Sequence, residues 1–86
     1  MARQDSTMTV KVYSPFKTYF DGLAISLSAV NDTGPFDILP GHKNFMSLLK
    51  ACTVNVRVPQ KPDFNLPISH GVMHVKTNQV TIFLDV

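Results

Sequence analysis

The residues with the most obvious chemistry are the histidines. His70 and His74 stand four apart, which is the spacing at which two histidines on one helix bind zinc. The apolar residues around them alternate, which predicts a strand, and on a strand four residues separate two side chains by roughly 13 Å. Two imidazoles that far apart cannot share one ion. We therefore expect surface or turn histidines, no metal site and no cofactor.

The nucleophile and the carboxylates do not assemble into a recognisable catalytic group. Cys52 alternates in phase with Val54 and Val56, so it is interpreted as a small core residue rather than a nucleophile. Asp32 and Asp37 are the nearest thing to an acid pair, and the chain has no glutamate and no GxSxG motif. We expect no catalytic residues and no enzyme activity.

Aromatic and basic residues leave a nucleic-acid function open. A surface that stacks single-stranded bases interleaves aromatic and basic side chains on one face, and the nearest match is Tyr13, Phe16, Lys17, Tyr19 and Phe20. The same side chains suit a core or a protein interface, the basic residues are scattered, and the net charge is only +2. A small β-barrel module that binds single-stranded nucleic acid or another ligand is therefore the alternative function.

The elements that position these residues are predicted to be strands of one small domain. The 86 residues suffice for one core. All six acidic residues are aspartate, while ten valines, four isoleucines and seven threonines favour strands. The one cysteine excludes an internal disulfide and favours a reducing compartment. We expect a flexible segment at 1–7, a domain at 8–86, no secretion signal and no transmembrane segment.

Alternation of apolar and polar residues predicts six or more short strands and several turns. The strands are expected at 9–13, 23–29, 36–39, 52–58, 72–75 and 80–85. Asp21-Gly22 and Thr77-Asn78 are expected to be tight turns, and the proline-rich stretch 59–67 a rigid loop or irregular edge. Phe45, Leu48 and Leu49 have helical spacing, long enough for one short turn. The expected fold is all-β, an antiparallel β-sandwich or barrel of short strands with at most one short helical turn.

A short apolar segment between two turns forms a corner at 34–42. Pro40 fixes its own φ angle, and Gly41 permits conformations that other residues avoid. The corner presents His42 at an edge of the predicted sheet. From the residues alone, the corner is either architectural or a rigid tip for interaction.

The corner also carries a resemblance. Ile-Leu-Pro-Gly-His at 38–42, followed by Phe-Met-Ser-Leu-Leu-Lys at 45–50, resembles the ILPGH signature of the epsilon subunit of F-type ATP synthase. The segments 12–15, 20–22, 68–75 and 80–85 resemble other parts of that family in the same order. The chain departs from the family at Pro35, where a glutamate is usual, and at Lys43 and Asn44, which replace alanine and proline.

The resemblance implies a non-catalytic rotor part of the central stalk. Family members link the gamma subunit to the membrane c-ring and couple proton translocation to ATP synthesis. It implies peripheral attachment at the cytoplasmic face of a bacterial inner membrane, with gamma and the c-ring as partners and no nucleic acid. It also implies that the chain lacks the C-terminal helical hairpin that can inhibit ATP hydrolysis.

By this similarity two groups of interface residues are expected. Those expected on the c-ring side are Thr33, Gly34, Pro35 and His42. Those expected to contact gamma are Ser14, Tyr19, Phe20, Asn44 and Met46.

Overall fold

The computed structural model describes residues 7–84, and within that range every regular element is a strand. The strands are β1 (Met8–Tyr13), β2 (Thr18–Ala24), β3 (Ser26–Asn31), β4 (Gly34–Ile38), β5 (Phe45–Leu49), β6 (Cys52–Arg57), β7 (Phe64–Ile68), β8 (Gly71–Lys76) and β9 (Gln79–Leu84). The predicted flexible segment, apart from Thr7, lies outside the described residues.

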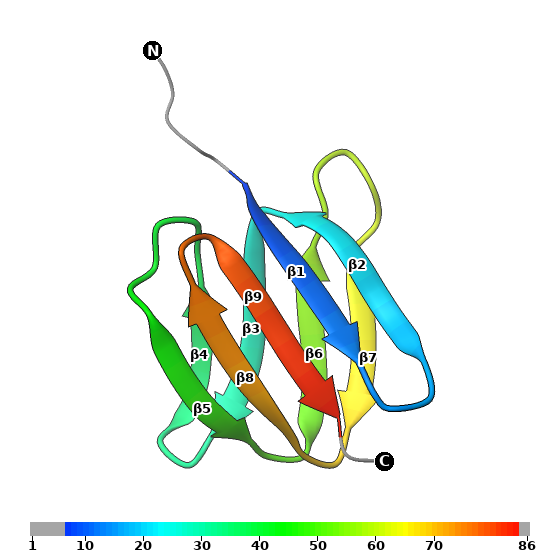
Figure 1. The fold of residues 1–86 in the computed structure, drawn as a ribbon, viewed down its shortest axis with the longest axis vertical. Coiled ribbons are helices and arrows are strands. Elements are labelled where there is room, and N and C mark those ends of the chain that lie inside the picture. Colours follow the sequence, from blue (N-terminus) through cyan, green and yellow to red (C-terminus); the bar gives the residue numbers. More distant parts are fainter. Residues whose placement is uncertain (1–6, 85–86) are drawn as a thin grey trace.

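The nine strands form two sheets that face each other. One sheet has five strands in the order β2-β1-β9-β8-β5, and the other has four in the order β4-β3-β6-β7 (Figure 1). All pairings are antiparallel except that of β1 with β9. The prediction of an all-β sandwich is confirmed.

Alternate residues of both sheets fill the space between them. The largest fully buried side chains are Leu27, Ile38, Met73, Ile82, Val10, Val12, Val54, Val56, Val75 and Val80. In β1, β6 and β9 the buried positions follow the predicted alternation. Because a strand places every second side chain on the same face, this pattern puts one face of each strand in the core.

The first turn lies elsewhere than predicted. Asp21 and Gly22 are inside β2, where they pair with Lys11 and Val10 of β1. The chain reverses earlier, because the Ser14 amide donates to the Lys17 carbonyl oxygen over 2.8 Å. The Ser14 hydroxyl oxygen also accepts a hydrogen bond from the Phe16 amide over 3.2 Å. A serine side chain that bonds its own turn supplies the reversal that Asp-Gly was expected to supply.

The strand predicted at 23–29 is two strands in different sheets. Ala24 ends β2 and Ser26 begins β3, with a bend at Ile25 whose amide donates to the Arg57 carbonyl oxygen over 2.8 Å. Ala24 and Leu27 are both buried, while Ile25 is exposed. The alternation changes phase because the two sheets face the core from opposite sides.

The predicted helical turn at 45–49 is wrong, since these residues form β5. This strand pairs with β8 from Phe45 opposite Val75 to Leu49 opposite Gly71. Its inward residues are Phe45, Ser47 and Leu49. The polar Ser47 is tolerated in the middle of this side because its hydroxyl oxygen accepts a hydrogen bond from the Asn31 side chain over 3.0 Å. Leu48 points outward, so the apolar pair Leu48-Leu49 imitates helical spacing.

Two other turn predictions agree with the structure. Thr77 and Asn78 form the two-residue β8–β9 turn with φ angles of 45° and 58°, as a tight hairpin of this kind requires. The proline-rich stretch becomes a loop followed by β7, an edge strand that includes Pro67. Proline is tolerated there because an edge strand has one unpaired side.

Candidate interaction surfaces

The second half of the predicted corner lies in the β4–β5 loop, residues 39–44, which is hydrogen-bonded to a neighbouring turn. We call this loop the corner. The His42 amide donates to the Leu39 carbonyl oxygen over 3.1 Å, and Gly41 between them has φ = +86°. The Gly41 amide donates to the Asn78 side-chain oxygen over 2.6 Å. Since Asn78 belongs to the β8–β9 turn, the corner is fixed to the five-stranded sheet.

His42 at this corner is a packing residue. It is half-buried, and its ring meets the edge of Phe45 with 5.5 Å between ring centres. Phe45 in turn contacts Phe36 of β4 at 5.8 Å. The Nδ1 atom lies 2.8 Å from the Lys43 carbonyl oxygen, which can only accept, so Nδ1 carries the proton. The aromatic series closes the β4/β5 side of the sandwich, and the corner is in this respect architectural.

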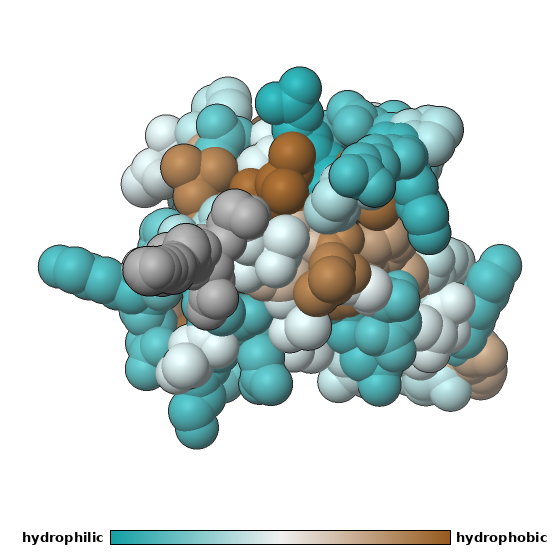
Figure 2. Space-filling model, turned by 90° about the horizontal axis from the view of Figure 1, so that it is seen from above, coloured by the Kyte–Doolittle hydropathy of each residue, from teal (hydrophilic) through white to brown (hydrophobic). Residues whose placement is uncertain are grey.

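The tip of the corner exposes apolar surface. Leu39 is exposed beside the buried Ile38. Figure 2 looks down on the end of the molecule that holds the corner and the β8–β9 turn, and there brown apolar patches interrupt the hydrophilic surface. The large apolar side chains exposed near this end include Leu39 and Ile25. Exposed apolar groups beside a rigid loop are suited to contact with another protein.

A row of apolar side chains crosses the outer face of the five-stranded sheet. Leu48 of β5 lies opposite Val72 of β8, which lies opposite Phe83 of β9, which lies opposite Tyr13 of β1. The rings of Phe83 and Tyr13 meet edge to face at 5.3 Å. Leu48 is 72% exposed. We call these four residues the apolar row, and the exposed Met46 lies beside it on the same face of β5.

The outer face of the four-stranded sheet is polar by contrast. The Ser28 hydroxyl donates to the Asp37 carboxylate over 2.6 Å. The Asn55 side chain donates to Asn65 over 2.8 Å and to Asp63 over 3.2 Å. These groups bond one another, and the large apolar side chains that are exposed among residues 7–84 lie outside β3, β4, β6 and β7. The two faces of the sandwich therefore differ, and the face with the apolar row is the one suited to a protein partner.

The structure separates the residues expected on the c-ring side. Thr33 lies in the β3–β4 turn, and Gly34 and Pro35 begin β4. His42 follows β4, so the last three residues of that strand, Phe36 to Ile38, and the start of the β4–β5 loop stand between the two groups. The strand spans about 15 Å, and the groups lie at opposite ends of the sandwich (Figure 1). Three of the four residues are brought together, and His42 is not among them.

The residues expected to contact gamma also fall into two groups. Ser14, Tyr19 and Phe20 lie in or beside β2, whereas Asn44 and Met46 lie in or beside β5. These strands are the two opposite edges of the five-stranded sheet. Ser14 is buried in its turn, and the ring of Phe20 packs inside the sandwich.

Sequence reasoning missed three members of the apolar row, namely Leu48, Val72 and Phe83. A usable signal was present, because Ile82, Phe83 and Leu84 are consecutive apolar residues in an alternating strand. An apolar residue at the solvent-facing position of such a strand indicates a second buried face. The partner strands that extend this signal into a row became known only with the register.

The residues with potential chemistry are spread out. His74 is exposed on β8, Cys52 is partly buried against the core, and His70 precedes β8. Residues 7–84 contain no group of three histidine, cysteine or acidic side chains placed to hold a metal ion. A search of the same residues finds no helix with the length and apolar character needed to cross a membrane.

Comparison with known proteins decides the family. A model described as "ATP synthase, Delta/Epsilon chain, beta-sandwich domain" matches residues 7–86. The chain belongs to this family. The resemblance carried by the corner motif is thereby confirmed.

Curated relatives agree with this assignment. The ATP synthase epsilon chain of Francisella tularensis subsp. holarctica is 37% identical over 78 residues, which are 91% of this chain and 53% of that protein. The epsilon chain of Nitratiruptor sp. is 27% identical over 79 residues, covering 92% of this chain and 61% of that protein. The chain thus spans about half to three-fifths of the length of these relatives.

Solved structures share the fold. A chain of the Euglena gracilis mitochondrial ATP synthase, solved as OSCP/F1/c-ring, superposes with a TM-score of 0.86 at 16% identity, over 96% of this chain and 53% of that chain. A chain of the Tetrahymena thermophila mitochondrial ATP synthase central stalk and c-ring superposes with a TM-score of 0.72 at 21% identity, over 98% and 67%. At these identities the likeness establishes the β-sandwich.

Proposed function

We propose that this chain is the β-sandwich part of a rotor subunit in the central stalk of an F-type ATP synthase. In this role it links the gamma subunit to the c-ring and couples proton translocation to ATP synthesis, without catalytic residues of its own. It works as a peripheral component of the F1 sector at the cytoplasmic face of a bacterial inner membrane. Support comes chiefly from the family match over residues 7–86.

The shape of the sandwich suits the transfer of torque. Nine strands pair continuously within two sheets, and the corner is tied by hydrogen bonds to the neighbouring β8–β9 turn. Load on such a body is shared among many cross-strand pairs and does not concentrate at one hinge. A stiff body transmits rotation with little loss to internal deformation.

The face that we propose for gamma is the outer face of the five-stranded sheet. It carries the apolar row and Met46, while the opposite face of the sandwich is polar. Large apolar groups at the centre of an interface supply most of its affinity. Asn44 and His42 adjoin the β5 edge of this face and extend the proposed contact.

The c-ring contact that we propose is the β3–β4 turn, with Thr33, Gly34 and Pro35. His42 lies at the other end of β4, so one flat surface cannot touch both groups. We therefore assign His42 to the gamma side. Pro35 is exposed, and a proline here gives the proposed contact a fixed backbone and no charge.

A co-purification experiment tests this function. The tagged chain is mixed with the gamma subunit encoded in the same genome, and the complex is isolated at physiological salt. We expect a stoichiometric complex, and we expect the variant Leu48→Lys to lose gamma while it remains folded. The matched control is Thr53→Lys on the polar sheet, which should retain gamma. A folded wild-type chain that fails to retain gamma would contradict the proposal.

A further inference from the structure

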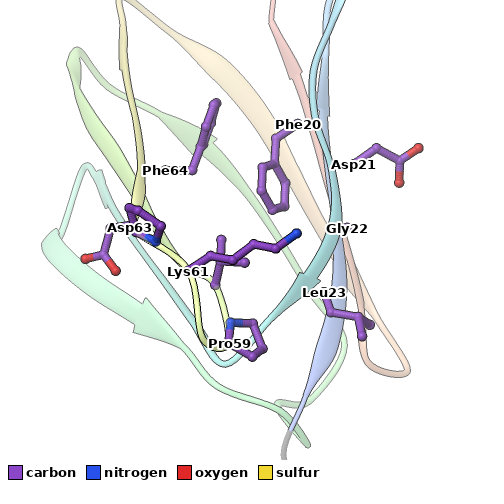
Figure 3. Close-up of a pocket in the computed structure, with 10 residues that line it drawn as sticks. Phe20, Asp21, Gly22, Leu23, Pro59, Lys61, Asp63 and Phe64 are labelled. Atoms are coloured by element: carbon purple, nitrogen blue, oxygen red, sulfur yellow. The ribbon is translucent and has the colours of Figure 1, made fainter.

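A cleft lies on the side of the sandwich away from the corner. It opens between the edge strand β2 and the loop that joins β6 to β7, with a volume of about 540 Å³ (Figure 3). This volume is within the range of roughly 300–1,000 Å³ typical of sites for small molecules. The lining is mainly apolar and includes Phe20, Leu23, Val58, Pro59, Pro62 and Phe64.

The two open sides of the sandwich are closed differently. On the β4/β5 side, Lys50 and Val30 share a backbone hydrogen bond of 2.9 Å, and Asn31 bonds Ser47 between the sheets. On the β2/β7 side, the rings of Phe20 and Phe64 meet at 5.0 Å. Next to this aromatic pair, β2 lines the cleft with Gly22, which has no side chain to fill the space. The glycine leaves the cleft open.

One charged group crosses this apolar cleft. Figure 3 shows the Lys61 side chain extending across it toward β2, while the Asp21 and Asp63 carboxylates point away. Among residues 7–84 the ion pair found is Lys50–Asp32, and Lys61 takes part in none. Asp63 instead accepts a hydrogen bond from Asn55. Lys61 is therefore the charged group that extends over the apolar walls, while the carboxylates of Asp21 and Asp63 lie at the rim of the cleft.

The loop that carries Lys61 is already shaped in the free chain. The Lys61 amide donates to the Val58 carbonyl oxygen over 3.4 Å, and Gln60 adopts a left-handed φ of 59°. Two prolines, Pro59 and Pro62, flank the turn and restrict its backbone. Because the backbone of the site is ordered before a ligand binds, binding costs little further conformational entropy.

We propose that this cleft binds a small amphipathic anion, namely an alkyl or aromatic tail with one carboxylate head. The tail lies against Phe20, Phe64 and Pro59, and the carboxylate pairs with the Lys61 ammonium. The site is separate from the apolar row, which lies on the outer face of the five-stranded sheet, because the cleft opens at the β2 edge toward the loop between β6 and β7; the corner lies on the β4/β5 side. The proposal therefore does not depend on gamma or the c-ring.

A titration with octanoate tests the site, using backbone amide chemical shifts of the ¹⁵N-labelled chain. We expect saturable shifts at 20–23 and 58–64 with a Kd of about 1 mM or tighter. Lys61→Met should raise that Kd about fivefold, the effect of one exposed ion pair. Lys61→Met should leave the affinity for 1-octanol, which lacks the charge, unchanged. The control Lys76→Met removes a lysine on β8 and should alter neither affinity.

A second variant narrows the cleft beside Phe20 without disturbing the fold. A Cβ atom at Gly22 would meet its nearest neighbour, Phe20, at an ordinary 3.7 Å. Gly22→Val should keep the melting temperature or raise it, since valine favours strands, and should weaken the binding of both octanoate and 1-octanol, because its side chain takes up space beside Phe20. Shifts that centre on Val72 and Phe83, or affinities that Gly22→Val leaves unchanged, would overturn the proposal, as would the absence of saturable binding.

Discussion

Replacing Leu48 with alanine separates two contributions of this side chain, one to the free energy of binding to gamma and one to the free energy of unfolding. Leu48 is 72% exposed in the free chain, so most of its apolar surface remains available to a partner. Alanine removes three carbon groups, each worth about 0.8 kcal/mol when buried. The exposed part of the side chain predicts a loss of about 1.7 kcal/mol of binding free energy for gamma. The part already covered in the free chain predicts a loss of about 0.7 kcal/mol of unfolding free energy.

The assay is a binding titration against the immobilised gamma subunit, together with thermal unfolding. Leu48→Ala should raise Kd about fifteenfold to twentyfold and lower the melting temperature by about 3–6 °C. The neighbouring control is Leu49→Ala, which faces the core at 3% exposure. It should cost about 2–5 kcal/mol of unfolding free energy and leave Kd unchanged below its melting temperature. A Kd for Leu48→Ala within twofold of wild type would refute the reasoning.

The remaining predictions concern the turns. Gly41→Ala should lower the unfolding free energy by about 1–2 kcal/mol in urea titration, because φ = +86° is unfavourable for any side chain; an unchanged midpoint would contradict this. Thr77→Asn should raise the unfolding free energy by about 0.5–1 kcal/mol, because asparagine tolerates φ = 45° better than a β-branched residue, and a lower melting temperature would count against it. Asp32→Asn removes the exposed pair with Lys50, 3.3 Å long, and should change stability by less than about 1 kcal/mol at any salt concentration; a larger loss would mean that this pair is structural.

Sequence patterns predict strands best where one face is buried and the other meets water. Val54 and Val56 of β6 alternate with polar residues, and the structure buries both. The pattern fails in β5, where an outward leucine precedes an inward one and Ser47 occupies the middle of the core-facing side. The physical cause is that Ser47 is satisfied by Asn31 from another strand, a contact that no local spacing reveals.

The fold also departs from local pattern where the chain changes sheets. A strand that continued from Leu23 to Ala29 would bury Ile25, but the chain bends there and enters the opposite sheet. Local alternation cannot report this, because both halves satisfy it separately. The phase change between Ala24 and Leu27 becomes interpretable only with the sheet order.

The candidate surfaces were partly within reach of the sequence. The corner motif was visible, and the strand predicted at 36–39 already implied that Thr33 and His42 lie at opposite ends. The apolar row was not visible in the sequence, because its members come from four strands spread between residues 13 and 83. Their alignment depends on register, which is set by the packing of the whole sandwich.

The most direct test of the proposed rotor role is a map of the surface that contacts gamma. Cross-saturation from protonated gamma onto the deuterated, ¹⁵N-labelled chain reports which amides lie near the partner. We predict the strongest effects in β5, β8 and β9 and at Tyr13, with little effect in β6 and β7. Effects confined to the four-stranded sheet, or none in the presence of excess gamma, would contradict this prediction.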